Sequence, residues 1–189
     1  KQILELAAGT GRFTVMLAER GADVTGMDIS APMLHRGLEK AERANITDKL
    51  HLFRGDAARL PFPDDHFDAV FAMRFFHLAD TPATFLSEMA RVSQDQVFFD
   101  TFNAISLRSV YNWLLPMGSR LYSQAQIRRL LGDTGLHLNS AEHDFVLPYG
   151  LYRKLPDVFA SPLRASDAKL SETTLGKRLA TVSYWNASV

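Results

Sequence analysis

The sequence predicts an α/β fold built on a doubly wound, mostly parallel sheet with helices on both faces. Over the first hundred residues, short apolar runs alternate with amphipathic stretches, which is typical of βαβ units. A glycine-rich turn follows the first apolar run, and an aspartate follows each of the next two. The turns after parallel strands meet at one edge of a sheet, so a ligand site is expected there.

The apolar runs of the first half predict five strands, at residues 2–6, 23–27, 50–54, 69–73 and 96–101. The amphipathic stretches between them predict helices over 12–20, after Ser30 and over 81–92. Gly21 ends the first helix, and Pro32 suits the first turn of the second. Pro61 and Pro63 keep the segment before the fourth strand out of regular structure.

The second half is less regular and contains two inserts, at about residues 104–122 and 148–170. The first insert is expected to be helical. Ser123 then caps a helix that Gly135 ends. Strands at about 137–146 and 180–189, with a short helix over 173–179 before the last strand, complete the pattern.

Length and composition limit the classes of protein that this chain can belong to. Its 189 residues fit a single domain, 1–189. Twenty-one basic residues balance 21 acidic ones, so the chain lacks the basic footprint of nucleic-acid binding. The absence of cysteine excludes disulfides and cysteine-based zinc sites, and no other metal cluster is evident.

No apolar run is long enough to span a membrane and no signal peptide is visible, so we expect a cytoplasmic protein. The chain begins at Lys1 and enters an apolar run at once. We therefore expect a natural N-terminal segment to be missing from it. The oligomeric state cannot be read from the sequence.

The string LELAAGTGR, residues 4–12, has the composition of a nucleotide-binding turn. Gly9 and Gly11 permit a tight strand-to-helix turn and a close approach of backbone to a ligand. A plain turn is the alternative interpretation. Thr14 stands where a dinucleotide fingerprint needs a third small residue, which disfavours NAD, and the turn lacks the lysine of a P-loop.

Asp28 and Asp56 follow the second and third strands at the same expected edge. Asp28 lies seventeen residues past Gly11, where a carboxylate can accept hydrogen bonds from both ribose hydroxyls of an adenosine. Capping of the helix that follows Ser30 is its alternative role. Asp56 could meet an adenine amino group, and Ala57 offers a backbone amide to a ring nitrogen.

The strings ELAAGTGRF, GMDISAPML and GDAARLPFPDDHFDAV together resemble the cofactor motifs of class I S-adenosylmethionine-dependent methyltransferases. They are most similar to the branch of ubiquinone and menaquinone biosynthesis enzymes and other small-molecule methyltransferases. The motifs cover about residues 2–80, and YSQAQIRRLLGDTGL resembles the late helix of the family more loosely. The resemblance implies a Rossmann-like, seven-stranded sheet whose last strand is antiparallel. From the irregular second half we add the expectation of helical lid inserts.

The resemblance implies a site for S-adenosylmethionine at the carboxyl ends of strands one to four. Glu5 would anchor the turn and reach the methionine ammonium through water. The other implied contacts are with the methionine, ribose and adenine, and with the pocket floor: Ala7, Gly9, Gly11, Asp28, Met27, Ile29, Met33, Asp56, Ala57 and Arg74. The family often has glycine in place of Ala7, and alanine permits the turn if its φ is negative.

The implied reaction is direct in-line displacement of the methyl group onto a small molecule, with release of S-adenosylhomocysteine. His77 is the candidate general base for a hydroxyl acceptor, and packing beside the cofactor is its alternative role. Phe75 and Phe76 could shape the pocket floor with Arg74, or one of them could belong to the core.

The two inserts are expected to form a lid over an acceptor that is partly apolar or aromatic. Their aromatic residues would line its pocket, or would instead complete the core: Tyr111, Trp113, Tyr149 and Tyr152. A non-catalytic relative that only binds the cofactor is the main alternative function. A nucleic-acid methyltransferase is less favoured, because MRFFHLAD follows strand four in place of an asparagine-proline-proline-aromatic tetrapeptide.

Overall fold

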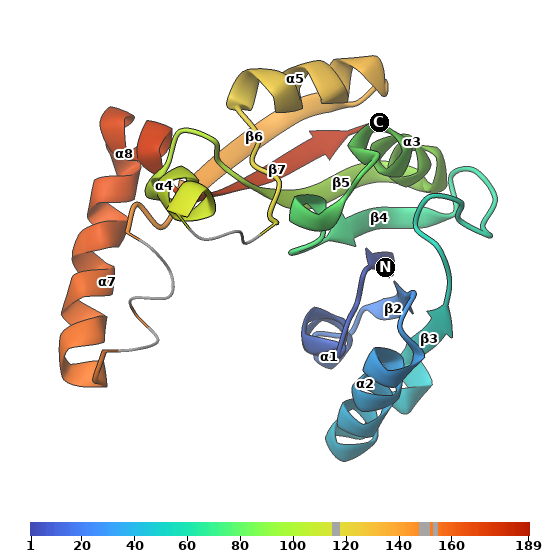
Figure 1. The fold of residues 1–189 in the computed structure, drawn as a ribbon. Coiled ribbons are helices and arrows are strands. Elements are labelled where there is room, and N and C mark those ends of the chain that lie inside the picture. The colour runs from blue at the N-terminus through green and yellow to red at the C-terminus, as the bar shows by residue number, and fades with distance from the viewer. Residues whose placement is uncertain (115–117, 148–151, 153–154) are drawn as a thin grey trace.

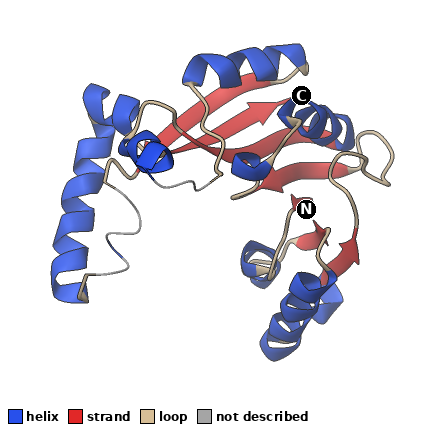
Figure 2. Ribbon diagram, viewed as in Figure 1, coloured by secondary structure: helices blue, strands red, loops and turns tan. Residues whose placement is uncertain are grey.

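The computed structural model describes residues 1–114, 118–147, 152 and 155–189, and its strands form a seven-stranded sheet (Figure 2). The strand order is β3-β2-β1-β4-β5-β7-β6. Strands β1 to β5 pair in parallel, while β7 is antiparallel to both of its neighbours. The strands are β1 Gln2–Leu6, β2 Asp23–Asp28, β3 Leu50–Arg54, β4 Phe67–Ala72, β5 Ser93–Phe102, β6 His137–Asp144 and β7 Val182–Ser188.

Helices cover both sides of this sheet, as Figure 1 shows, with α1 and α2 on one side and α3 and α5 on the other. Helices α4, α7 and α8 gather at the end of the sheet beyond β6 and β7. The helices are α1 Arg12–Glu19, α2 Ala31–Ala44, α3 Pro82–Val92, α4 Leu107–Leu114, α5 Gln124–Asp133, α7 Asp157–Glu172 and α8 Thr174–Leu179. The turns η1 Thr47–Lys49 and η2 Phe76–Leu78 are 3-10 helices.

The main core lies between the sheet and helices α3 and α5. Leu86 and Met89 of α3 and Ile127 and Leu131 of α5 are fully buried in it against the strands. A smaller cluster, around Val24, lies between β2 and the first two helices. Burial of these apolar faces is the main term that holds helices on a sheet.

The predicted fold class is confirmed, including the antiparallel last strand. Ser123 caps α5 in a complete capping box with Gln126, as its position predicted. The first insert is helical over Leu107–Leu114 only, and its residues 115–117 lie outside the described residues. The second insert contains α7, with Pro162 inside the helix.

Candidate functional site

The turn between β1 and α1 is held by backbone hydrogen bonds and by one side chain. Ala8 N–H donates to the carbonyl of Met27 at 3.0 Å, and Gly11 N–H donates to that of Ala8 at 2.9 Å. Three of its residues have a positive φ: Ala7, Gly9 and Gly11. The turn therefore follows a left-handed path that glycine adopts without strain.

Ala7 departs from the expectation, because its φ is +52° and not negative. A left-handed conformation costs an L-residue with a Cβ roughly 1–2 kcal/mol. The backbone thus keeps the path that glycine would take, and the surrounding hydrogen bonds hold alanine in it. The cavity described below is lined in part by Ala7.

Gly11 is required for a second reason besides its φ of +66°. It is the N-cap of α1, and a Cβ placed on it would lie 3.1 Å from Cα of Gly37 in α2. The two glycines let α1 and α2 approach closely, which sets where α1 begins relative to the second strand.

Asp28 ends β2 and binds backbone on two sides. Its Oδ2 accepts the Gly9 N–H at 2.8 Å, and its Oδ1 accepts the Ser30 N–H at 2.8 Å. The carboxylate therefore joins the glycine turn to the start of α2. The second of these contacts satisfies an amide at the beginning of a helix, which is the capping alternative.

Lys40 of α2 supports the same turn and was not predicted. Its Nζ donates to the carbonyl and to the hydroxyl of Thr10, both at 2.8 Å. No local motif marks this lysine, since it lies thirty residues from its partner and on an amphipathic helix. Only the packing of α2 against the turn reveals it.

Glu5 lies buried beneath the turn, with 2% of its surface exposed. Thr14, also buried, donates its hydroxyl to Glu5 Oε2. Burial, and to a lesser extent the nearby charge of Asp28, raises the pKa of Glu5 to about 7, against the opposing effect of the Thr14 hydrogen bonds. Thr14, which stands where a dinucleotide-binding turn needs a small residue, is thus the hydrogen-bond partner of the buried Glu5 carboxyl group.

A cavity of about 350 Å³ opens at the carboxyl ends of β1 to β4. Six of the predicted cofactor contacts line it: Ala7, Met27, Asp28, Ile29, Asp56 and Ala57. Phe75, a candidate for the pocket floor, lines it as well, together with Gly55, Leu78 and Phe85. The mostly apolar wall with a few carboxylates at one side is the form of a small-molecule site.

The other predicted cofactor contacts lie around this cavity and do not line it. Glu5, Gly9 and Gly11 belong to the turn and its support. Met33 lies in the first turn of α2 with 41% of its surface exposed. Phe75 lines the cavity while Phe76 is fully buried in the core, so each of the two phenylalanines takes one of the predicted roles.

Arg74 follows β4 and binds the buried carboxylate of Asp100 in β5. Its backbone N–H donates to Asp100 Oδ1 at 2.5 Å, and its Nε lies 3.3 Å from Oδ2. These contacts hold Arg74 at a φ of +60°. Burial raises the pKa of Asp100, although the Arg74 backbone amide and charge act in the opposite direction.

His77 lies in η2, with its ring 4.9 Å from that of Phe102. Burial and the charges of Arg108 and Arg74 lower the pKa of His77 to about 4. The ring is therefore neutral near pH 7 and can accept a proton, but it is a weaker base than an ordinary imidazole.

The aromatic residues of the inserts are not gathered as expected. Trp113 is 84% exposed and so forms no wall of an enclosed pocket, because the short helix α4 turns it to the surface. Tyr152 contacts the ring of Phe145 at 6.1 Å. Tyr149 and the side chain of Tyr111 lie outside what the structure describes.

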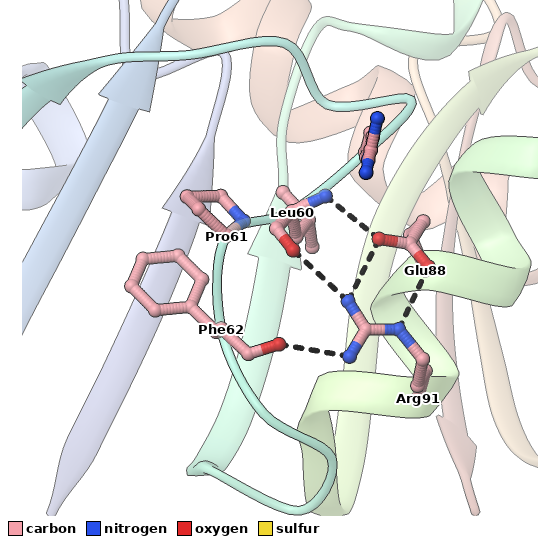
Figure 3. Close-up of a pocket in the computed structure, with 6 residues that line it drawn as sticks. Leu60, Pro61, Phe62, Glu88 and Arg91 are labelled. Atoms are coloured by element: carbon pink, nitrogen blue, oxygen red, sulfur yellow. Dashed lines mark hydrogen bonds and ion pairs between the residues drawn. The ribbon is translucent and has the colours of Figure 1, made fainter.

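The loop LPFPDDHFD, residues 60–68, contacts α3 and lies beside a separate hollow (Figure 3). Arg91 donates to the carbonyls of Phe62 at 2.8 Å and Leu60 at 3.1 Å, and it pairs with Glu88 and Asp64. Glu88 Oε2 in turn accepts the Leu60 N–H at 2.7 Å. Residues 60–68 therefore fix backbone before β4 and do not line the cavity, whereas Gly55, Asp56 and Ala57, earlier in the same motif, do.

Within the described ranges, no three His, Asp or Glu side chains are grouped so that they could hold a metal ion. In the same part of the chain, no helix is both long and apolar enough to cross a membrane.

Comparisons with known proteins agree with this geometry. A family model described as a methyltransferase domain matches residues 3–96. The demethylmenaquinone methyltransferase of Thermus thermophilus is 44% identical over 95 residues, which cover 49% of this chain and 42% of the relative. That of Lactiplantibacillus plantarum is 33% identical over 154 residues, covering 73% and 64%. The chain spans about half the length of the curated relatives it matches.

Among solved structures, the magnesium protoporphyrin IX methyltransferase of Synechocystis PCC 6803, with bound SAH, superposes with a TM-score of 0.70. The match covers 98% of this chain and 73% of that chain at 17% identity. A likeness at this identity concerns the fold.

Replacement of Arg91 by methionine should lower the free energy of unfolding by about 2 kcal/mol, because two carbonyls and the Glu88 carboxylate lose their donor. Denaturant unfolding of Arg91→Met, with Arg129→Met on the exposed face of α5 as the control, measures this. A loss of unfolding free energy no larger than that of the control would show that the Arg91 hydrogen bonds do not stabilise the loop.

The pKa of Glu5 predicts a pH dependence of stability. Below pH 4.5 the group is protonated in both the folded and the unfolded state, and above about pH 7 it is ionised in both. Between these values the folded state retains the proton, so stability falls as pH rises. At 1.36 kcal/mol per pH unit, the total loss is about 3 kcal/mol. Urea unfolding at pH 5 and pH 8 should show that wild type loses about this much more stability than Glu5→Gln, which keeps the other titrating groups.

Proposed function

Since this chain belongs to the class I S-adenosylmethionine-dependent methyltransferases, we propose that it transfers a methyl group from S-adenosylmethionine to a small molecule. The observation that carries the proposal is the cavity at the ends of β1 to β4. Six residues that the motifs selected, at the ends of β1, β2 and β3, line this one space. These residues meet at the edge of the sheet where open α/β folds bind their ligands, which a chance grouping would not explain.

The carboxylates at the cavity suit an adenosine. Asp28 is already oriented by the Gly9 and Ser30 amides, and each of its oxygens retains a lone pair for a ribose hydroxyl. One oxygen of Asp56 accepts a hydrogen bond from the Ala58 N–H at 2.9 Å, which leaves the other oxygen for an adenine amino group. Ile29, 67% exposed, is free to pack on the ring.

Glu5 would respond to the methionine end of the cofactor. In the structure its carboxyl group is half protonated at about pH 7, because burial disfavours the charge. An ammonium group nearby would favour the ionised form. Affinity for the cofactor would then rise with pH through this range.

The bound sulfonium supplies an activated methyl group, so the chain has to position the acceptor and exclude water. Phe75, Leu78 and Phe85 form an apolar wall of the cavity, which keeps water from the reacting atoms. Alignment of the nucleophile with the sulfur–methyl bond would supply up to about 7–11 kcal/mol of the rate enhancement in favourable cases. We keep His77 as the candidate base for an acceptor that must lose a proton.

The acceptor is proposed to be a partly apolar or aromatic small molecule. Relatives named as demethylmenaquinone methyltransferases support a quinone-like ring. The first insert borders a second cavity of about 430 Å³ that is mainly apolar and is lined in part by Ile105, Leu107 and Val146. This supports a role of the inserts as the acceptor lid. The lack of cysteine supports a cytoplasmic site of action.

A protein that only binds the cofactor is the second candidate function. The observation that favours it is the low pKa of His77, since a base at about 4 removes a proton from a hydroxyl poorly. An acceptor carbon or thiol that needs no strong base would reconcile the same pKa with catalysis.

Calorimetric titration with S-adenosylmethionine, S-adenosylhomocysteine and NAD tests the proposed cofactor. The first two should bind saturably, and Asp28→Ala should abolish binding, because the ribose hydroxyls lose their acceptor and the turn loses its anchor. Asp48→Ala, on the exposed turn η1, is the control. Thermal unfolding of both variants separates lost binding from lost folding. Tight binding of NAD would overturn the proposal.

The role of His77 is tested by turnover with demethylmenaquinone and with simple phenols as acceptors, measured as release of S-adenosylhomocysteine. If His77 acts as base, His77→Ala should lower turnover by about a hundredfold or more while affinity for the cofactor stays the same. Unchanged turnover in His77→Ala would remove the base assignment and leave a packing role.

A further inference from the structure

A group of cationic and aromatic side chains lies next to the proposed cofactor cavity. It consists of Arg74, His77, Phe102 and Arg108, and we refer to it as the Phe102 cluster. Arg108, in the first turn of α4, places its guanidinium carbon 3.7 Å from the centre of the Phe102 ring. Arg74 lies 5.7 Å from the same ring centre, and the His77 ring lies 4.9 Å from it.

The cluster is fixed to the edge of the sheet where the cavity opens. Phe102 ends β5 and is 4% exposed, and its carbonyl accepts the Tyr122 N–H at 2.8 Å. His77 lies between the cavity residues Phe75 and Leu78 in sequence, within a short 3-10 turn. An acceptor that approaches the cavity from the side of β4 and β5 would therefore meet this cluster.

The charges in the cluster do not balance. Asp100 pairs with Arg74, and the lowered pKa of His77 leaves that ring neutral near pH 7. Arg108 has no carboxylate within 4.0 Å among the described residues, and the residues outside that set include no Asp or Glu. One positive charge thus stays uncompensated in a partly dry environment.

The hydrogen bonds of Arg108 are also incomplete. Its Nη2 donates to the Ser119 hydroxyl at 3.2 Å, while its buried Nε finds no partner in the part of the chain that the structure describes. A buried donor without an acceptor is costly, more so on a charged group. Burial and the charge of Arg74 both lower the pKa of Arg108.

We propose that the acceptor carries a carboxylate or phosphate group and that Arg108, which lies over the Phe102 ring, binds it. This inference rests on the proposed methyl transfer. The N–H edge of a planar guanidinium matches carboxylate and phosphate oxygens. Arg108 would then determine which small molecules enter, while Asp100 positions Arg74 beside it.

The test uses three probes on the chain saturated with S-adenosylhomocysteine: benzoate, its neutral analogue benzamide, and inorganic phosphate. Calorimetric titration should show that benzoate, phosphate or both bind and that benzamide does not. Arg108→Met should lower the affinity for the anion by about tenfold or more. Arg108→Lys should restore part of the affinity, because it keeps the charge without the planar fork. Arg129→Met on α5 is the control and should bind as wild type does.

Each outcome separates this inference from the proposed function. Binding of S-adenosylhomocysteine by Arg108→Met at wild-type affinity shows that the variant folds and that the cofactor site is intact. If benzamide binds as well as benzoate, or if Arg108→Met binds both anions as tightly as wild type, the inference is wrong although methyl transfer stands. If S-adenosylhomocysteine itself does not bind, the proposed function fails. Titration of the free chain with the same anions then still decides whether Arg108 binds them. A preference for phosphate or for benzoate identifies the acceptor group.

Discussion

The carboxylate of Asp28 is the constraint on which the geometry of the site depends. This one side chain accepts a hydrogen bond from a backbone amide of the glycine turn and a second one from the backbone amide just before α2. Two loops that follow different strands are therefore fixed to a single point at the end of β2. Lys40 and Gly37 on α2 then contact the same turn from the other side. The turn, the strand and the helix form one rigid unit, and this is why Ala7 can remain in a left-handed conformation.

This arrangement also explains why the buried Glu5 is tolerated. Thr14, the third residue of α1, places its hydroxyl on the carboxyl group only because the turn starts α1 at Arg12. A buried carboxyl group whose pKa is raised despite its hydrogen bonds from Thr14 is a weak point in stability near neutral pH. Positions that lower stability in this way are often retained where a ligand supplies the missing partner.

The sequence was sufficient for most of the fold because its signals were local. Alternating apolar runs, Ser123 before an amphipathic helix, and Pro32 after Ser30 each predict their own element, and the structure has all of them. The cavity residues Asp28, Asp56 and Ala57 could be predicted because each directly follows a strand. Lys40 and Asp100 could not be predicted, since their partners are thirty and twenty-six residues away and no spacing rule connects them.

The inserts were predicted less well for a related reason. Trp113 was assigned to a pocket from its type alone, whereas the direction of an aromatic side chain on a short helix depends on how that helix packs. The φ of Ala7 was also not predicted, because alanine was expected to keep a negative φ, whereas the backbone follows the left-handed path that glycine takes.

The position of β7 between β5 and β6 has a consequence for how the protein is made. During synthesis β6 leaves the ribosome well before β7, and within the described residues β6 pairs with no strand other than β7. Until residues 182–188 emerge, β6 exposes an unpaired edge, and α5, which packs on it, lacks a completed surface. The half of the sheet that bears the proposed cofactor cavity can assemble earlier, because each of β2 to β5 pairs with a strand that has already emerged. We therefore expect the nascent chain to hold a formed cofactor half beside an open edge that chaperones could protect.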